Sequence, residues 1–338
     1  MTNHQLISSI QSQLETAYPA DEAEALAWWV AEEITGLSRT QLQIGCKDTT
    51  FFANMQKINE TNADLQQIIA RLLRFEPIQY IFGHTLWYGL DLKVTPATLI
   101  PRPETAELVE QISNFKFQIS NCRVLDIGTG SGCIAIALKK RHPEWQVTGI
   151  DISAEAIEVA KENARRNGVE VNFQVADIFD PIEQIQSNLK SQISNLKYDA
   201  VVSNPPYIRE SEKSSMKPNV LNYEPASALF VPDKDPLLFY RRIASLFSNH
   251  QSPITNHQSP ISNDQSPISN LQSPISNHQL PITNDQSPIS NLQSPTTLFF
   301  EINEAFPQEL SALLKSLGYT DIQIFHDIYS KPRIIAAR

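Results

Sequence analysis

The stretch VLDIGTGSG at residues 124–132 decides the fold of this chain. Its first half is an apolar run typical of a buried strand, and its second half is a GxGxG turn that leads into the apolar helical run 133–138. Glycine lets a backbone pass close to a ligand, and the free N–H groups at a helix start attract negative charge. The spacing is not the GxGxxG of dinucleotide-binding folds, and such a turn also occurs without any ligand. A strand, a glycine turn and a helix in this order predict an α/β fold.

Two more strand–helix units follow, and each brings an acidic side chain to the end of its strand. The next strand ends in Asp151, 23 residues after Gly128, where a carboxylate can accept hydrogen bonds from two ribose hydroxyls. The strand expected at 171–175 leads to Asp177 and Ile178, which suit the exocyclic amine and the ring of an adenine. Taken alone, each residue also fits an ordinary structural role. Because parallel strands end at one edge of a sheet, the series predicts a nucleoside site there.

A fourth apolar run, at 198–202, stops at the sequence SNPPY of residues 203–207. Proline cannot donate to a strand ladder and restricts the residue before it, so we expect a strand that ends in a short, stiff loop. The Asn204 side-chain carbonyl and the Pro205 backbone carbonyl are acceptors that suit a planar –NH2 group. The Tyr207 ring can lie against a planar amide or base. Alone, the loop is equally consistent with a proline-rich turn capped by asparagine.

The segments before this unit predict a smaller domain and a connection. Residues 1–76 contain amphipathic helices without chemistry of their own, which indicates a small helical domain. Residues 77–101 change character, and the runs 80–84 and 86–94 predict a β-hairpin or two short strands. Residues 102–338 then form the larger domain.

A low-complexity tract interrupts the larger domain at about 248–296. From Gln251 it repeats every seven residues as QSPITNH, QSPISND and QSPISNL, with near copies after them. The proline in each repeat excludes a coiled-coil helix, and the wealth of Gln, Ser and Asn predicts a disordered linker. Similar fragments at 118–121 and 192–197 indicate that one repeat family expanded into three surface loops. After the tract, a strand, a helix and two closing strands are expected.

Composition narrows the class of protein. The 338 residues, 41% of them hydrophobic, suffice for two domains with a real core. The net charge of −10 argues against a nucleic-acid partner held by a broad basic surface. Cys46, Cys122 and Cys133 form no CxxC motif and no even set, so no metal and no disulfide is expected. Without a signal pattern or an apolar run of membrane length, we expect a cytoplasmic protein without a membrane partner.

Together these motifs resemble the class I S-adenosylmethionine-dependent methyltransferases. The combination of LIPRPET at 99–105 with NPPYI at 204–208 is narrower, and is similar to the HemK/PrmC family of peptide chain release factor N5-glutamine methyltransferases. NPPY alone is shared with adenine-N6 methyltransferases. The resemblance covers nearly the whole chain apart from the repeats. It implies an α/β, Rossmann-like, mostly parallel seven-stranded sheet, S-adenosyl-L-methionine as cofactor, and the GGQ loop of release factors as substrate of a monomer.

Position by position, the resemblance also implies roles for individual residues. Asn204 and Pro205 would act in catalysis by accepting both hydrogens of the substrate amide. The implied substrate-binding residues are Asn204, Pro205, Pro206 and Tyr207. The implied cofactor-binding residues are Gly128, Thr129, Gly130, Ser131 and Gly132 for the methionine part, Asp151 for the ribose, Asp177 and Ile178 for the adenine, and Asn204.

Two departures from the family pattern and two alternative functions accompany this hypothesis. The heptad tract occupies the place of a glycine-containing turn, and the run at 328–332 lacks the glycine that the family tends to carry between Asp327 and Arg333. An adenine-N6 nucleic-acid methyltransferase would use the same loop on a flipped base, but needs a phosphate-binding surface. A non-catalytic scaffold would keep the fold only, and the intact glycine turn and NPPY loop count against it.

Overall fold

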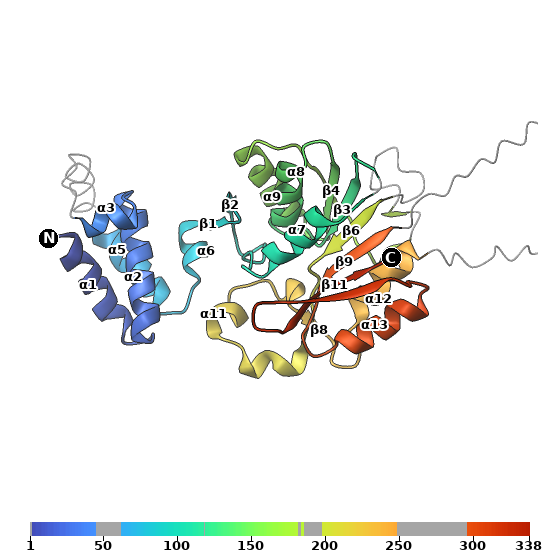
Figure 1. Cartoon of the computed structure of the whole chain (residues 1–338). Coiled ribbons are helices and arrows are strands. Elements are labelled where there is room, and N and C mark those ends of the chain that lie inside the picture. Colours follow the sequence, from blue (N-terminus) through green and yellow to red (C-terminus); the bar gives the residue numbers. More distant parts are fainter. Residues whose placement is uncertain (1, 45–61, 118, 182–183, 186–197, 249–295) are drawn as a thin grey trace, which may run out of the picture.

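The structure is a computed structural model that describes residues 2–44, 62–117, 119–181, 184–185, 198–248 and 296–338. Figure 1 shows a group of N-terminal helices at one end and a larger α/β unit at the other. The heptad repeats at 251–295 and the fragment at 192–197 lie outside the described residues, so the disorder expected for the repeats and the surface loop expected for the fragment stay predictions.

The N-terminal helices pack around one apolar core. They are α1 (Asn3–Leu14), α2 (Ala20–Thr35), α3 (Arg39–Gln43) and α5 (Asn62–Leu72). The apolar stripes read from the sequence face inward, and Ile10, Val30 and Leu72 are fully buried. Gly36 ends α2 in the left-handed conformation, with φ of 68°, which glycine adopts without steric cost. Periodicity predicted α1, α2 and α5, and the stop signal at Gly36 predicted the end of α2, whereas the short helix α3 was not expected.

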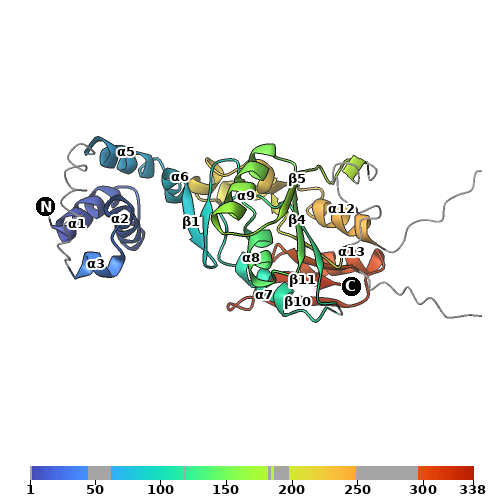
Figure 2. The ribbon, with the colours of Figure 1, turned by 90° about the horizontal axis from the view of Figure 1, so that it is seen from above.

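The connection contains a helix as well as the expected hairpin. Strands β1 (His84–Trp87) and β2 (Leu90–Lys93) pair antiparallel, so a hairpin forms, but its turn at residues 88–89 lies inside the expected run 86–94. Residues 80–82 belong to helix α6 (Ile78–Phe82), so the strand expected at 80–84 is wrong over that part. The helix forms because Pro77 stands at its start and Gly83, with φ of 77°, ends it. Figure 2 shows α6 and β1 between the N-terminal helices and the larger unit.

A seven-stranded sheet forms the centre of the larger unit, in the order β10-β11-β9-β6-β3-β4-β5. Its strands are β3 (Arg123–Ile127), β4 (Gln146–Asp151), β5 (Asn172–Val175), β6 (Ala200–Ser203), β9 (Thr297–Glu301), β10 (Ile322–His326) and β11 (Pro332–Ala337). The pairs among β5, β4, β3, β6 and β9 are parallel, and β11 runs antiparallel to both of its neighbours. The predicted mostly parallel seven-stranded sheet of the class I methyltransferase fold is confirmed.

Helices cover both faces of the sheet. Side chains alternate along each strand, so Val124 faces one apolar cluster and Leu125 the other. The first cluster contains α7 (Thr105–Asn114), α8 (Cys133–Arg141) and α9 (Ala154–Arg166), and the second contains α12 (Leu238–Phe247) and α13 (Pro307–Ser316). Strands that are buried on both faces have apolar residues at nearly every position. For this reason the strands of the sheet could be predicted from the sequence.

The segment between β6 and α12 returns over the carboxyl ends of the strands. It consists of β7 (Ile208–Arg209), η1 (Glu210–Ser215), α11 (Pro218–Leu221), η2 (Ala226–Ala228) and β8 (Phe230–Val231). None of these short elements was expected from the sequence. The Tyr223 hydroxyl donates to the backbone carbonyl of Arg74 at 2.9 Å, so the segment also contacts the N-terminal helices.

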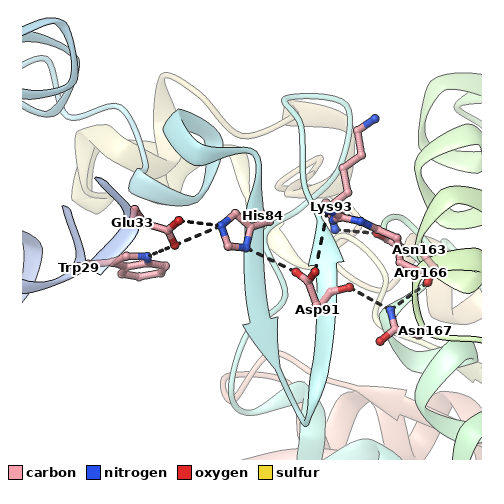
Figure 3. A network of polar contacts seen from close by, with 8 residues as sticks. All are labelled: Trp29, Glu33, His84, Asp91, Lys93, Asn163, Arg166 and Asn167. Atoms are coloured by element: carbon pink, nitrogen blue, oxygen red, sulfur yellow. Dashed lines mark hydrogen bonds and ion pairs between the residues drawn. The ribbon is translucent and has the colours of Figure 1, made fainter. Parts of the chain in front are cut away.

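A polar network joins the N-terminal helices to the larger unit through the hairpin (Figure 3). His84 Nε2 lies 3.1 Å from the Glu33 carboxylate on α2, and His84 Nδ1 lies 3.4 Å from the Asp91 carboxylate on β2. The Asn167 side chain, just after α9, donates to the Asp91 backbone carbonyl at 2.9 Å. The hairpin therefore contacts both parts of the molecule. The described helices include none that is long and apolar enough to cross a membrane.

Candidate active site

A cavity of about 270 Å³ opens at the carboxyl ends of β3, β4, β5 and β6. This edge is where ligands bind in open α/β sheets. The residues expected from the sequence that line the cavity together are Gly128, Gly130, Asp151, Asp177, Ile178, Asn204, Pro205 and Pro206. Four expected residues do not line it, namely Thr129, Ser131, Gly132 and Tyr207. The strand ends thus converge on one cavity, as the series in the sequence indicated.

The three glycines of the turn serve two different purposes. Gly128 and Gly130 have positive φ, 70° and 53°, and a Cβ at either would meet no atom closer than 4.0 Å. They leave an open backbone surface at the cavity. Gly132 has φ of 81°, but a Cβ there would lie 3.0 Å from the Phe173 ring and 3.1 Å from Ala160. The third glycine is therefore required for packing of the turn and its helix, as well as for the backbone conformation.

Asp126 holds this turn from inside. Its side chain is fully buried, and the Thr129 hydroxyl donates to its Oδ2 at 2.6 Å. Burial raises the pKa of Asp126 to about 7. The backbone N–H groups of Gly128 and Thr129 both donate to the carbonyl of Ile150, which ties the turn to the neighbouring strand. Asp126 and Thr129 therefore support the turn and do not line the cavity.

Asp151 links the turn to the second strand end. Its Oδ2 accepts the Gly130 N–H at 2.9 Å, and its Oδ1 accepts the Ser153 N–H at 2.9 Å. Each carboxylate oxygen has two lone pairs, so both can still accept a hydroxyl from the cavity. Burial raises the pKa of Asp151, and the two backbone hydrogen bonds oppose this rise.

The third strand end forms an apolar slot with a polar edge. Ile178 is buried, and Phe179 and Phe239, whose ring centroids lie 5.5 Å apart, line the cavity beside it. The Asp177 carboxylate accepts the Phe179 N–H at 2.8 Å, which turns the chain at the cavity wall. A slot of this kind suits a flat aromatic ring that carries a hydrogen-bond donor.

The loop at 203–207 is anchored on both sides. The Ser203 hydroxyl donates to the carbonyl of Ile127 at 2.7 Å, and Asn204 Nδ2 donates to the Thr105 hydroxyl at 3.2 Å. The Tyr207 hydroxyl donates to Glu301 Oε1 at 3.2 Å, behind the cavity wall. Asn204 lines the cavity while Tyr207 does not. The stacking of Tyr207 on a substrate group therefore stays a prediction.

Part of the cavity wall comes from distant segments and was not expected from the sequence. Ala97 and Leu99 precede α7, and Pro225, Ser227 and Ala228 belong to the segment after the NPPY loop. A partly buried ion pair joins these two walls, because Arg102 Nη2 lies 2.6 Å from Oε1 of the buried Glu224. The backbone N–H of Ile100 donates to the other Glu224 oxygen at 3.2 Å. The LIPRPET motif indicated the wall that contains Ala97 and Leu99. Nothing in the local sequence indicates that Glu224 would pair with it.

The described residues contain no group of three or more His, Cys, Asp or Glu arranged to hold a metal ion.

Two family models match the chain, a methyltransferase domain over residues 118–247 and a PrmC N-terminal domain over residues 5–83. The release factor glutamine methyltransferase of Bacteroides thetaiotaomicron is 36% identical over 334 residues, which cover 99% of each chain.

The chain belongs to the release factor glutamine methyltransferase family. A second member of this family, from Flavobacterium psychrophilum, is 33% identical and aligns over 95% of this chain and 94% of its own. A crystal structure of the hMettl16 catalytic domain with a MAT2A 3′UTR hairpin aligns with 74% of this chain and 76% of its own, at 16% identity and a TM-score of 0.46. The resemblance to release factor glutamine methyltransferases inferred from the motifs is therefore confirmed by the full-length relatives.

Proposed function

We propose that this protein transfers the methyl group of S-adenosyl-L-methionine to the side-chain amide nitrogen (N5) of the glutamine in the GGQ motif of peptide chain release factors. The observation that carries the proposal is that Asn204 and Pro205 line the same cavity as Gly128, Gly130 and Asp151. Two hydrogen-bond acceptors for a substrate amide thus lie beside the glycine turn, which suits a ligand with an amino-acid part and a nucleoside part. The full-length relatives, which are named release factor glutamine methyltransferases, support the choice of substrate.

The residues of the cavity fit S-adenosylmethionine. The open backbone of Gly128 and Gly130 leaves room for its methionine part, and free lone pairs on Asp151 can accept two ribose hydroxyls. The slot of Ile178 and Phe179, with Asp177 at its edge, matches an adenine ring and its amine. When bound, this cofactor supplies a methyl group on a positively charged sulfur. The same turn also contains Thr129, Ser131 and Gly132, which do not line the cavity. They would contribute to cofactor binding by keeping the backbone of the turn in its conformation.

The glutamine amide needs help because its nitrogen lone pair is delocalised into the carbonyl. Asn204 Oδ1 and the Pro205 carbonyl accept the two N–H hydrogens and direct the lone pair at the methyl group, which is a positioning effect. The same acceptors stabilise the positive charge that develops on nitrogen. Pro206 and Tyr207 stiffen and anchor the loop. As the N–C bond formed, the bond between the methyl carbon and the cofactor sulfur would break, and the nitrogen would then release its proton to water, so no side-chain base is required.

The organisation of the chain follows from this function. We assign residues 1–76 to substrate docking, 77–101 to a linker, and 102–338 to methyl transfer, interrupted by the insertion at about 248–296. The protein is proposed to act as a cytoplasmic monomer without a metal. The net charge of −10 supports a protein substrate over a nucleic acid.

The two alternative functions are less well supported. An adenine-N6 methyltransferase would not account for the match to a PrmC N-terminal domain at residues 5–83. A non-catalytic scaffold has no need of acceptors at Asn204 and Pro205 beside an open glycine turn.

Transfer of labelled methyl from S-adenosylmethionine tests the proposal. The acceptors are a bacterial release factor, the same factor with its GGQ glutamine changed to alanine, and DNA. Label on the unchanged factor alone is the expected result. Label on DNA would replace the proposal with the adenine enzyme, and cofactor binding without any transfer would favour the scaffold.

A further inference from the structure

We infer that Thr105 and Glu301 are positioning residues for this reaction, because together they determine which end of the Asn204 side-chain amide faces the cavity. The inference rests on the proposed function, in which the Asn204 oxygen must accept a hydrogen from the substrate amide. It concerns two residues outside the NPPY loop, neither of which lines the cavity.

A chain of hydrogen bonds behind the cavity wall connects Asn204 to Thr105 and Thr105 to Glu301. Asn204 Nδ2 donates to the Thr105 hydroxyl at 3.2 Å, and the Thr105 hydroxyl donates to Glu301 Oε2 at 2.7 Å. Thr105 is the first residue of α7, and Glu301 is the last residue of β9. Strands β6 and β9 are paired so that Ser203 lies opposite Phe300, which brings Asn204 and Glu301 to the same end of the sheet.

The chemistry of Glu301 gives this chain a direction. A carboxylate accepts hydrogen bonds and donates none. The single hydrogen of the Thr105 hydroxyl therefore goes to Glu301, and the Thr105 oxygen is left with lone pairs only. It can then bind only the –NH2 end of the Asn204 amide. The carbonyl end, Asn204 Oδ1, is consequently directed away from Thr105, on a side chain that lines the cavity.

Burial protects this arrangement from water. Thr105 is 2% exposed and Glu301 is 4% exposed, so water does not compete for their hydrogen bonds. The second oxygen of Glu301 accepts the Tyr207 hydroxyl at 3.2 Å, and the Tyr240 hydroxyl donates to the Glu301 backbone carbonyl at 3.0 Å. Burial raises the pKa of Glu301, and the hydrogen bonds from Thr105 and Tyr207 oppose this rise because they favour the carboxylate.

Reversal of this direction would remove the acceptor from the substrate site. If residue 301 donated a hydrogen to Thr105, the Thr105 hydroxyl could donate to Asn204, and the Asn204 amide could turn over. Its –NH2 group would then meet the –NH2 group of the glutamine, two donors without an acceptor between them. A carboxylate at position 301 is therefore required for more than the packing of β9.

Three variants and a matched control test this inference. Thr105→Val removes the hydroxyl and keeps the shape, Thr105→Ser keeps the hydroxyl, and Glu301→Gln converts an acceptor into a group that can donate. Glu304→Gln is the same change three residues further on, at a partly exposed side chain paired with Lys331. For each variant, kcat and KM are measured with the release factor, and the Kd is measured with S-adenosylhomocysteine.

We expect Thr105→Val and Glu301→Gln to lower kcat by about 10- to 100-fold, the size of effect that misplacement of a reacting group produces. Their Kd for S-adenosylhomocysteine should stay at the wild-type value, which also shows that the site is folded. Thr105→Ser should recover most of the rate, and Glu304→Gln should match the wild type. A double variant with both Thr105→Val and Glu301→Gln should lose no more activity than the more impaired of the two single variants, because both changes break the same chain of hydrogen bonds.

Two outcomes would overturn the inference while the proposed function stands. One is a wild-type kcat in both Thr105→Val and Glu301→Gln. The other is a loss of rate that Thr105→Ser does not recover, or that comes with an equal loss of S-adenosylhomocysteine affinity, since a merely structural role predicts either. If the wild-type protein transfers no methyl group to the release factor glutamine, the proposed function fails first, and the inference fails with it.

Discussion

The imidazole of His84 lies 3.1 Å from the carboxylate of Glu33, and this contact connects the hairpin to the N-terminal helices (Figure 3). The same imidazole lies 3.4 Å from Asp91. One ring thus stands between carboxylates of two different segments. The arrangement holds the N-terminal helices against the connection that leads to the cavity.

A double-mutant cycle on Glu33→Gln and His84→Ala measures the strength of this contact. The two side chains are 24% and 31% exposed, so solvent screens them, and we expect a coupling free energy of about 0.5 kcal/mol. The coupling should decrease in high salt, because dissolved ions screen a contact between partly exposed charges. Urea unfolding of the four proteins gives the value. A coupling that salt leaves unchanged would contradict an ionic contact.

Asn204→Ala removes one of the two proposed acceptors for the substrate amide. We expect kcat to fall about 10²–10³-fold, as for the loss of one transition-state hydrogen bond. Affinity for S-adenosylhomocysteine should be retained, because the glycine turn and Asp151 stay in place. Steady-state methyl transfer and calorimetry measure the two quantities. Asn172→Ala, at an exposed asparagine on β5, is the matched control and should behave as the wild type. Near-normal turnover in Asn204→Ala would refute the assignment.

Asp151→Asn tests the proposed ribose site in the cavity. The side chain keeps its size but one of its two backbone donors, Gly130 or Ser153, meets an –NH2 group in place of an oxygen. Hydrogen bonds to charged groups contribute about 1.5–3 kcal/mol, so we expect S-adenosylhomocysteine to bind at least about 10-fold more weakly. Calorimetric titration gives the Kd. Asp321→Asn, an exposed aspartate before β10, should leave it unchanged, and equal affinities in both variants would count against a ribose site at Asp151.

Asp126 should make the stability of the protein depend on pH. Its pKa is about 7 in the folded protein and about 3.9 in an unfolded chain. Between these values the unfolded chain binds fewer protons, so the free energy of unfolding should decrease as the pH rises, by about 4 kcal/mol in all, and should level off above pH 7. Urea unfolding from acidic to neutral pH, compared with Asp126→Asn, isolates this contribution. Parallel curves for the two proteins would show that burial does not hold the proton on Asp126.

Ser330→Gly is expected to stabilise the turn between β10 and β11. Ser330 has φ of 60°, in the left-handed region that favours glycine. Relief of this backbone strain, about 1–2 kcal/mol, is partly offset by the greater freedom of glycine in the unfolded chain, which leaves a gain of about 0.5–1 kcal/mol. Thermal unfolding measures it. Ser316→Gly, at the end of helix α13, is the control and should destabilise. Destabilisation by both changes would exclude strain at Ser330.

Local sequence was sufficient to predict the glycine turn and the acidic strand ends that line the cavity. The turn at 128–132 could be predicted because glycine, strand and helix preferences are properties of a few adjacent residues. The acids at the strand ends, Asp151 and Asp177, could be placed on one edge because parallel strands end together. The helix at residues 78–82, which was wrongly expected to be partly a strand, could also have been predicted locally, because Pro77 and Gly83 are ordinary start and stop signals for a short helix.

Only the tertiary structure decided what surrounds Asn204. Its partner Thr105 is 99 residues away in sequence, and Thr105 in turn meets Glu301, 196 residues away. An acid within an apolar strand was visible in the sequence, but its partners depend on which strands lie side by side. The order β9-β6-β3 is set by packing of both faces of the sheet, which no local pattern contains. The sequence by itself therefore determined the main strands and helices of the sheet unit and the glycine turn, and the folded sheet determined the hydrogen bonds that orient the NPPY loop.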